Sequence, residues 1–283
     1  MKLQTKVEFP KSRVRLSLND RITVLGSCFA DNIGEMMSHC GFKVCVNPFG
    51  TLYNPVSLAN SIARLRSGIC FEEKDCVEMG AGAGLVCSFS HHTSFARKSK
   101  EEFLENANAA LEQACGFWEE SNKVIITLGT SWCFRHGEET VANCLKRPAA
   151  EFERYCLDCS TVRSILESIV LSNPDKEFIF TVSPIRHLAD GAHGNQISKS
   201  TLLMACDSVS RHPHCDYFPA YEILMDELRD YRFYAEDMVH PSSQTIGYIW
   251  ERFQDFALNP EEKQALIENE KAWKTSQHRQ ILR

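Results

Sequence analysis

Four short apolar runs, each followed by turn-forming residues, constrain the fold of this 283-residue chain more than any other feature. Such runs are typical of β-strands that are covered on both faces, and the run at 123–129 is the clearest example. Strands of this kind need helices on either side of their sheet. The four runs are residues 22–25, 42–46, 123–129 and 177–182.

Segments with helical periodicity alternate with these runs. The order strand–helix–strand already appears within the first fifty residues, which favours a parallel sheet with right-handed crossovers. We expect a fifth, short strand at 216–219 and therefore an α/β fold with a doubly wound sheet. The expected helices are residues 31–40, 55–66, 101–120, 161–171, 195–210, 220–228 and 242–256.

We expect one domain over residues 1–283, because the sequence contains neither an internal repeat nor a long linker. Its core should span about residues 20–258. The charged tail at 259–283 is expected to be helical and to have no role in the core. Residues 80–84 contain three glycines and predict a flexible turn before a short apolar stretch at 85–89.

Composition limits the partners and the location that we expect. With 43% apolar residues the chain can bury a substantial core, but no run approaches the ~18 apolar residues of a membrane-spanning helix. The first eight residues lack the apolar segment of a secretory signal, so we expect a cytoplasmic protein. A net charge of −6 without a long basic run argues against nucleic acid or an anionic membrane as the main partner.

Thirteen cysteines are a high and odd number for a chain of this length. In a cytosolic protein the default is reduced, mostly buried thiols with a packing role. Cys156 and Cys159 form one C-x-x-C, but no second pair stands at zinc spacing. A redox or metal role for this pair is the minor alternative, and we expect no metal site.

Ser27 follows Gly26 at the end of the first apolar run. A serine at this position projects into the crevice at the carboxyl end of the sheet, where open α/β folds bind ligands. Asp237 and His240, three residues apart near the C-terminus, could supply the base and the group that orients it. Taken singly, Ser27 could instead be a helix cap, and Asp237 a cap that precedes a surface histidine.

Three strand ends should converge on this crevice. Ser27 follows the first strand, Gly50 the second, and Gly129-Thr130-Ser131 the third. Backbone N–H groups beside Ser27, such as that of Cys28, and at Gly50 are candidate donors to an oxyanion. The Cys28 thiol itself is expected to point elsewhere, which makes a cysteine nucleophile improbable.

Jointly, these motifs resemble those of the GSCFA family, named after the pentapeptide at 26–30, which belongs to the SGNH (GDSL-like) hydrolase superfamily. The resemblance covers roughly residues 20–258. It implies a flavodoxin-like, three-layer α/β/α fold with a mainly parallel five-stranded sheet. It also implies a serine nucleophile at Ser27, with His240 as base and Asp237 as the acid that orients it. The segments that carry it are residues 26–30, 47–55, 127–130, 181–187, 195–199, 217–222 and 237–242.

The resemblance further identifies Gly50 as the second-block glycine, a backbone donor to the oxyanion. The third block of the superfamily is Gly-x-Asn, which corresponds to Gly129-Thr130-Ser131 in this chain. A serine therefore stands where the carboxamide donor is expected, and its hydroxyl is shorter. A second departure is Leu145, at a position where the family commonly has histidine.

Several other polar residues could face the same crevice. His92 could lie in the site or, like His91, in a loop that covers it. Arg186 could bind a carboxylate or phosphate, or form a structural ion pair, and His187 follows it at the end of a strand. Asn195 and Lys199 fall on one helix face, either in the pocket or at the surface.

The combined expectation is a serine hydrolase that acts on ester bonds. The preferred substrate is polar and carbohydrate-like, carrying an acetyl or similar small acyl group. Neither a metal nor an organic cofactor is required, since a triad and an oxyanion hole suffice. One alternative is an acyltransferase with the same residues, and another is a non-catalytic binding module with a degraded site. The oligomeric state is left open.

Overall fold

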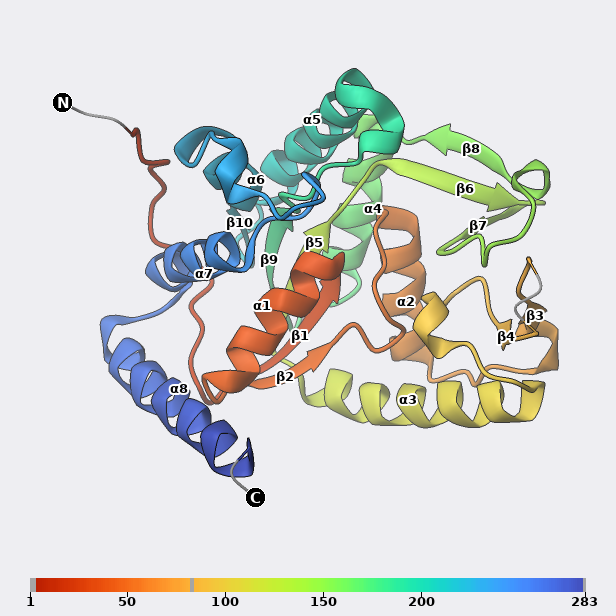
Figure 1. The fold of residues 1–283 in the computed structure, drawn as a ribbon, viewed down its shortest axis with the longest axis horizontal. Coiled ribbons are helices and arrows are strands. Elements are labelled where there is room, and N and C mark those ends of the chain that lie inside the picture. The colour runs from red at the N-terminus through yellow and green to blue at the C-terminus, as the bar shows by residue number, and fades with distance from the viewer. Residues whose placement is uncertain (1–3, 82–83, 282–283) are drawn as a thin grey trace.

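The computed structural model describes residues 4–81 and 84–281 (Figure 1). The expected turn at 80–84 therefore falls partly outside the described residues. Among the helices described, none combines the length and the apolar character needed to cross a membrane.

A five-stranded, wholly parallel sheet forms the centre of the molecule. Its strand order is β10-β9-β5-β1-β2, so β1 and β5 lie side by side in the middle. The predicted α/β fold with five parallel strands is confirmed. The strands are β1 (Arg21–Gly26), β2 (Lys43–Val46), β5 (Lys123–Leu128), β9 (Glu177–Val182) and β10 (Cys215–Phe218).

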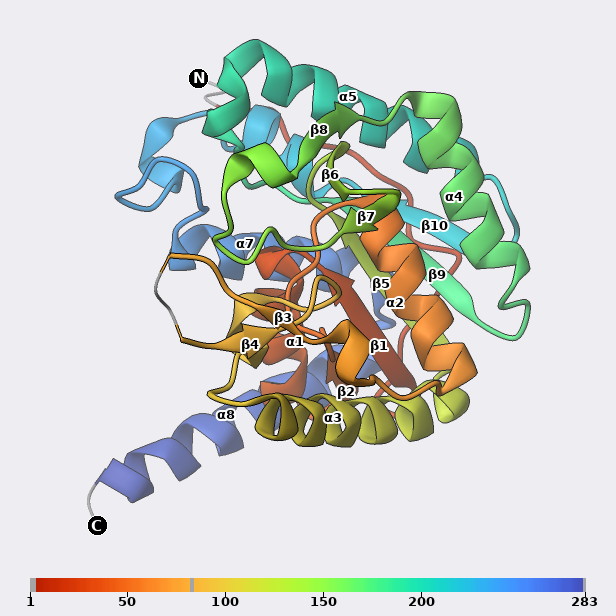
Figure 2. The same cartoon turned by 90° about the vertical axis from the view of Figure 1, so that its right-hand side faces the viewer.

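Helices cover both faces of this sheet, which gives the three layers α/β/α (Figures 1 and 2). One face carries α1 (Cys28–His39), α7 (Ser243–Ala257) and α8 (Pro260–Ile281). The other carries α2 (Pro55–Ser67), α3 (Lys100–Glu120), α4 (Cys159–Leu171) and α5 (Gly191–Val209).

The central strands alternate between two hydrophobic cores because successive side chains of a strand point to opposite faces. In β5, Val124 and Ile126 pack under α2 to α5, whereas Ile125 packs under α1 and α7. Full burial of one such side chain contributes roughly 1.5–3 kcal/mol relative to exposure. The near-continuous apolar runs of the sequence thus reflect burial on both sides.

The corner between β1 and α1 is tighter than expected. The helix begins at Cys28 rather than at residue 31, directly after Ser27. Gly26 has a φ of +140°, and a Cβ at this position would overlap the carbonyl oxygen of Thr127. Only glycine fits between the two central strands at this point.

Antiparallel strands between the parallel ones were not predicted. A three-stranded sheet of order β7-β6-β8 follows β5 directly, and a two-stranded sheet pairs β3 with β4. These strands are short and partly exposed, so they lack a clear hydrophobic pattern; the expected stretch at 85–89 keeps only two strand residues. Their bounds are β3 (Val77–Glu78), β4 (Val86–Cys87), β6 (Trp132–His136), β7 (Glu139–Val141) and β8 (Glu153–Cys156).

The tail has a core role, contrary to expectation. Leu266 of α8 is 1% exposed and belongs to the core under α1. The Asn269 amide donates to the Cys40 carbonyl at 2.9 Å, and the Trp273 ring stacks on His39. These contacts attach α8 to the end of α1, although the helix is charged overall.

Shorter helical segments complete the chain. The expected helix at 220–228 is one turn of α-helix, α6 (Ala220–Glu222), followed by a π-helical turn at Ile223–Glu227. The single 3₁₀ turns are Glu73–Asp75, Thr93–Phe95, Ala149–Glu151, Leu188–Asp190 and Tyr231–Phe233.

Candidate active site

Ser27 lies at the carboxyl end of β1 and is the N-cap of α1. Its Oγ accepts a hydrogen bond from Phe29 N at 3.3 Å, and its own N–H donates to the Thr127 carbonyl at 3.2 Å. The residue is only 1% exposed. The capping role considered from the sequence is therefore present, and the hydroxyl also lies at the sheet edge where the three loops meet.

Asn47 organises the loop beside Ser27, and sequence reasoning had not singled it out. Its side-chain oxygen accepts from Gly26 N at 2.8 Å, and its amide donates to Asp31 at 2.6 Å. Asn47 has a φ of 41°, which asparagine tolerates better than most residues. The Asn-Pro turn after the second apolar run was the available signal.

Gly50 is held by the same turn. Its N–H donates to the Asn47 carbonyl at 2.7 Å, so a substrate oxygen would have to compete for this donor. Its φ is +79°, and a Cβ would overlap that of His92. The close approach of His92 brings this imidazole to the second strand end.

Asp237 and His240 form a closed hydrogen-bonded pair. Asp237 Oδ2 lies 2.6 Å from His240 Nδ1, while Oδ1 accepts from the N–H groups of Val239 and His240 at 2.9 Å each. The hydrogen bonds from the His240 backbone and ring lower the pKa of Asp237 to about 2. The carboxylate thus stays charged and leaves Nε2 of His240 available to another group.

Arg186 binds the loop that contains Asp237 and His240. Its N–H donates to the Val239 carbonyl at 3.1 Å, and its guanidinium donates to the Met238 carbonyl at 3.0 Å. The guanidinium also lies over the rings of Tyr231 and Tyr234, 5.7 and 5.5 Å from their centroids. Arg186 thus has the structural role that the sequence suggested as one alternative. Its partners are backbone carbonyls and aromatic rings, not the carboxylate of an ion pair.

Lys199 is fully buried, which excludes the surface alternative. Its ammonium donates to the carbonyls of Gly129 and Ser183 at 2.6 and 2.8 Å, joining the ends of β5 and β9. Burial lowers the pKa of Lys199 to about 7. Asn195 is also buried and accepts from His187 N at 2.9 Å.

The His187 imidazole lies near both Lys199 and His240. Burial lowers its pKa to about 4, and the charge of Lys199 acts in the same direction; the carbonyl of Gly129 opposes this, and His240 makes a smaller lowering contribution. Its Nε2 is buried and has no hydrogen-bond partner within the described part of the chain. His187 is therefore a neutral imidazole at the strand ends, with one nitrogen unused.

The third strand end is fully bonded internally. Gly129 and Thr130 donate their N–H groups to the Tyr53 carbonyl at 2.9 and 3.0 Å. Ser131 is buried, and its Oγ lies 3.2 Å from the Cys156 thiol. Its backbone N–H donates to Ser198 Oγ at 2.9 Å. The Ser131 hydroxyl thus contacts the Cys156 thiol and is not free to bind an oxyanion.

Cys28 begins α1 after the first strand end, and His92 lies beside Gly50 at the second. Burial and the charge of Asp31 raise the pKa of the half-buried Cys28 thiol, while Lys199 partly offsets this. Burial also raises the pKa of Asp31, against the hydrogen bond from Asn47 and the nearby His92. The imidazole of His92 accepts from Ser94 N at 3.3 Å. Charges from all three strand ends therefore act on one another.

Leu145 lies outside this group of polar residues. Leu145 is completely buried in the hydrophobic core, so the departure from histidine is accommodated by packing. The thirteen cysteines are all free thiols. Within residues 4–81 and 84–281, the His, Cys, Asp and Glu side chains form no cluster suited to a metal ion.

Among the described residues, no hydrogen bond joins the Ser27 hydroxyl to the His240 ring. The Ser27 hydroxyl accepts from Phe29 N instead, and His240 Nδ1 is bonded to Asp237. Surface cavities of about 640, 480, 630 and 260 Å³ are lined by residues other than Ser27, Asp237 and His240. Proton transfer from Ser27 to His240 would therefore require the Ser27 hydroxyl to leave its hydrogen bond with Phe29 N.

Comparison with known proteins gives one assignment. No curated protein matches the chain. The family model described as "GSCFA family" matches residues 21–253, from the start of β1 to the last turns of α7. This span includes every strand of the central sheet and all the residues of the crevice, and the chain therefore belongs to the GSCFA family.

Proposed function

We propose that this protein is a serine hydrolase of SGNH type that acts on ester bonds. The observation that carries the proposal is the Asp237–His240 pair, with 2.6 Å between Oδ2 and Nδ1. A carboxylate bound to one ring nitrogen fixes the tautomer in which the other nitrogen can accept a proton. Ser27, at the end of β1, is the hydroxyl on which this base would act.

The proposed reaction has two halves. The Ser27 hydroxyl turns away from Phe29 N and gives its proton to His240 Nε2 while Oγ attacks the ester carbonyl. His240 then passes the proton to the leaving alcohol, and an acyl-serine forms. In the second half, water attacks this ester and gives its proton to His240, which returns it to Ser27 as the acid leaves. Asp237 stabilises the protonated imidazole throughout.

Backbone donors suit the oxyanion better than side chains. The N–H of Cys28, the first residue of α1, belongs to the donors that a helix leaves without an intrahelical acceptor. The N–H of Gly50 is a second donor if the turn to Asn47 opens. Ser131 has no part in this scheme, because its hydroxyl contacts Cys156.

The proposed substrate is a polar, carbohydrate-like ester with a small acyl group. Imidazoles and polar groups at the strand ends, including His92 and His187, favour a hydrogen-bonding substrate over a long lipid chain. An acyltransferase would use the same residues, with a sugar hydroxyl in place of water. A binding module is favoured by one observation, the absence of a hydrogen bond from Ser27 to His240 in the described structure.

Covalent labelling separates these functions. A fluorophosphonate probe should label the wild-type protein on Ser27, and p-nitrophenyl acetate hydrolysis should fall at least about 10³-fold in Ser27→Ala. Ser38→Ala, on the exposed side of α1, is the matched control and should retain labelling and activity. If the wild-type protein is neither labelled nor faster than Ser27→Ala, the enzyme proposal is wrong and the binding module stands. Acceleration by added acceptor sugars would identify the transferase.

A further inference from the structure

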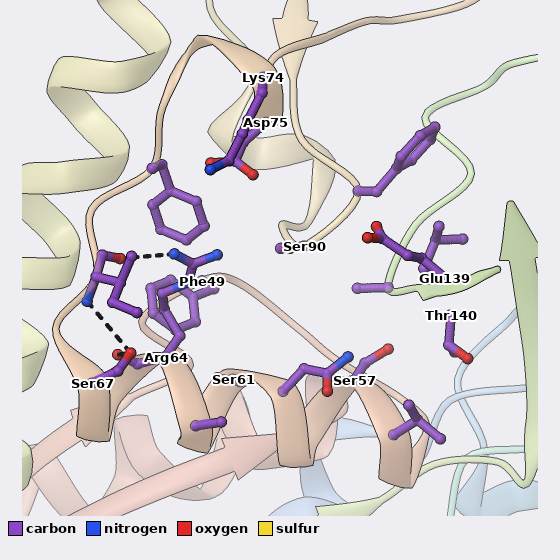
Figure 3. Close-up of a pocket in the computed structure, with 18 of the residues that line it drawn as sticks. Phe49, Ser57, Ser61, Arg64, Ser67, Lys74, Asp75, Ser90, Glu139 and Thr140 are labelled. Carbon is purple, nitrogen blue, oxygen red and sulfur yellow. Dashed lines mark hydrogen bonds between the residues drawn. The ribbon is translucent and has the colours of Figure 1, made fainter. Parts of the chain in front are cut away.

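A cavity of about 640 Å³ is lined by residues other than those of the candidate active site (Figure 3). One face of α2 forms its floor, and the segments 69–75, 89–90 and 139–142 form its walls. Its volume is within the range of small-molecule sites. The cavity is therefore large enough to hold a ligand of its own.

Three polar residues of α2 face this cavity. Ser57, Ser61 and Arg64 are four and three residues apart, so they lie along one side of the helix. The two serines are 4% and 5% exposed, and their hydroxyls have no hydrogen-bond partner within residues 4–81 and 84–281. An unsatisfied buried hydroxyl costs about 1–3 kcal/mol, so the floor of the cavity contains two hydroxyls that could still accept or donate a hydrogen bond.

Arg64 is held in place without an acidic partner. It donates to the Ile69 carbonyl at 2.8 Å, and its guanidinium lies 4.4 Å from the centroid of the Phe71 ring. Within the described part of the chain no carboxylate lies within ion-pair distance of it. The guanidinium is thus fixed, charged and able to receive a carboxylate in a bidentate manner.

Glu139 lies on the opposite side of the cavity, at the start of β7 (Figure 3). Its carboxylate likewise has no ion pair among the described residues. The two other charged groups of the lining are occupied by Glu72: Lys74 pairs with its carboxylate at 2.6 Å, and Asp75 accepts from its N–H at 2.8 Å. Lys74 is therefore paired and Asp75 is partly engaged, which leaves Arg64 and Glu139 as groups of opposite charge on two sides of the cavity.

We propose that this cavity binds a small zwitterion of the amino-acid or dipeptide class. The ligand carboxylate binds Arg64, and its ammonium group binds Glu139. Its apolar side chain packs on Phe49 and Phe71, which line the same cavity. A simple anion would meet the charge of Glu139, and a simple cation that of Arg64; a molecule with both charges at its two ends satisfies both. This assignment is independent of the proposed hydrolase.

Calorimetric titration of the full chain with glycyl-phenylalanine tests the proposal. The N-acetylated dipeptide lacks the ammonium group and the C-amidated dipeptide lacks the carboxylate, and both should bind at least about tenfold more weakly than the zwitterion. Arg64→Gln should weaken binding of the zwitterion by about 10- to 100-fold but leave the C-amidated form unchanged. Glu139→Gln should likewise weaken binding of the zwitterion by about 10- to 100-fold, but it should leave the affinity for the N-acetylated dipeptide unchanged.

Matched variants keep the test specific. Arg66→Gln lies on the same helix and Glu138→Gln beside Glu139, both outside the cavity lining, and neither should change the affinity. Arg64 also donates to the Ile69 carbonyl, so the thermal stability of Arg64→Gln is compared with that of the wild-type protein. Glu139 is exposed, so Glu139→Gln tests the site without disturbing the core. The proposal is overturned if the wild-type protein does not bind the zwitterion, if Arg64→Gln and Arg66→Gln behave alike, or if uncharged glucose binds equally well.

Discussion

The two halves of the candidate active site are built in opposite ways. Ser27 is buried at 1% exposure, and its backbone is bonded to the neighbouring central strand. The side chain of His240 is 48% exposed and lies in the loop between the 3₁₀ turn Tyr231–Phe233 and α7. One half is fixed by the sheet, and the other is held by hydrogen bonds within the 235–240 segment and by Arg186.

This difference shows where movement can occur. The serine cannot shift without disturbing β1 and β5, because Gly26 leaves no free space beside Thr127. Arg186 attaches the loop of His240 to the end of β9, and hydrogen bonds join Asp237 to His240, so we expect these two residues to move together if the loop shifts. Variants that affect one half at a time can break or sharpen this comparison.

The largest effect is expected at Gly26. Gly26→Ala places a Cβ against the Thr127 carbonyl and forces alanine to a φ of +140°, so we expect a loss of several kcal/mol in unfolding free energy. Urea unfolding measures it. The control is Gly247→Ala, in α7 with open space around it, which should be neutral or stabilising. Equal stability of the two variants would mean that the β1–α1 corner is not rigid.

Asp237→Asn tests the other half. The amide keeps the shape but loses the charge that stabilises protonated His240, so kcat should fall about 10³-fold with little change in KM. Esterase kinetics measure it, with circular dichroism to show that the fold is kept. An unchanged kcat would show that another carboxylate orients His240.

Lys199, at the end of the sheet, should make the stability of the fold depend on pH. Its pKa is lowered to about 7 by burial, whereas an unfolded lysine titrates near ~10.4. Between these values the unfolded chain binds a proton that the folded protein does not, so the wild-type stability should rise with pH relative to Lys199→Met. The difference should grow by up to about 1.4 kcal/mol per pH unit. Urea unfolding at pH 7, 8 and 9 would contradict this if the difference stayed constant.

The smallest effect is expected at Arg186. Arg186→Ala removes the hydrogen bond to Met238 and the contacts with Tyr231 and Tyr234, so the His240 loop should loosen. We expect kcat to fall about tenfold, equivalent to about 1.4 kcal/mol, without loss of the fold. Arg229→Ala, an exposed neighbour with a surface ion pair, is the control. If KM rises while kcat is unchanged, Arg186 binds substrate instead.

The sheet could be predicted because its strands are buried on both faces and therefore carry near-continuous apolar runs. The antiparallel strands β6 to β8 could not, since their exposed residues leave no clear period. The tail was misjudged for a related reason: its charged surface hid Leu266, one core position among many solvated ones. Sequence patterns report burial, and they fail where burial is partial.

By itself, the sequence determined the parallel α/β fold, the position of Ser27 at a strand end and the local Asp237–His240 pair. The fold follows from the pattern of apolar residues. The position of Ser27 follows from Gly26, whose backbone conformation only glycine readily adopts. The pair follows from the separation of three residues between Asp237 and His240. Only the tertiary structure decided that Lys199 joins two strand ends, that Ser131 faces Cys156 and that Arg64 faces Glu139 across a cavity. These contacts join segments that are far apart in the sequence. A local sequence pattern does not determine which distant residue a side chain will contact.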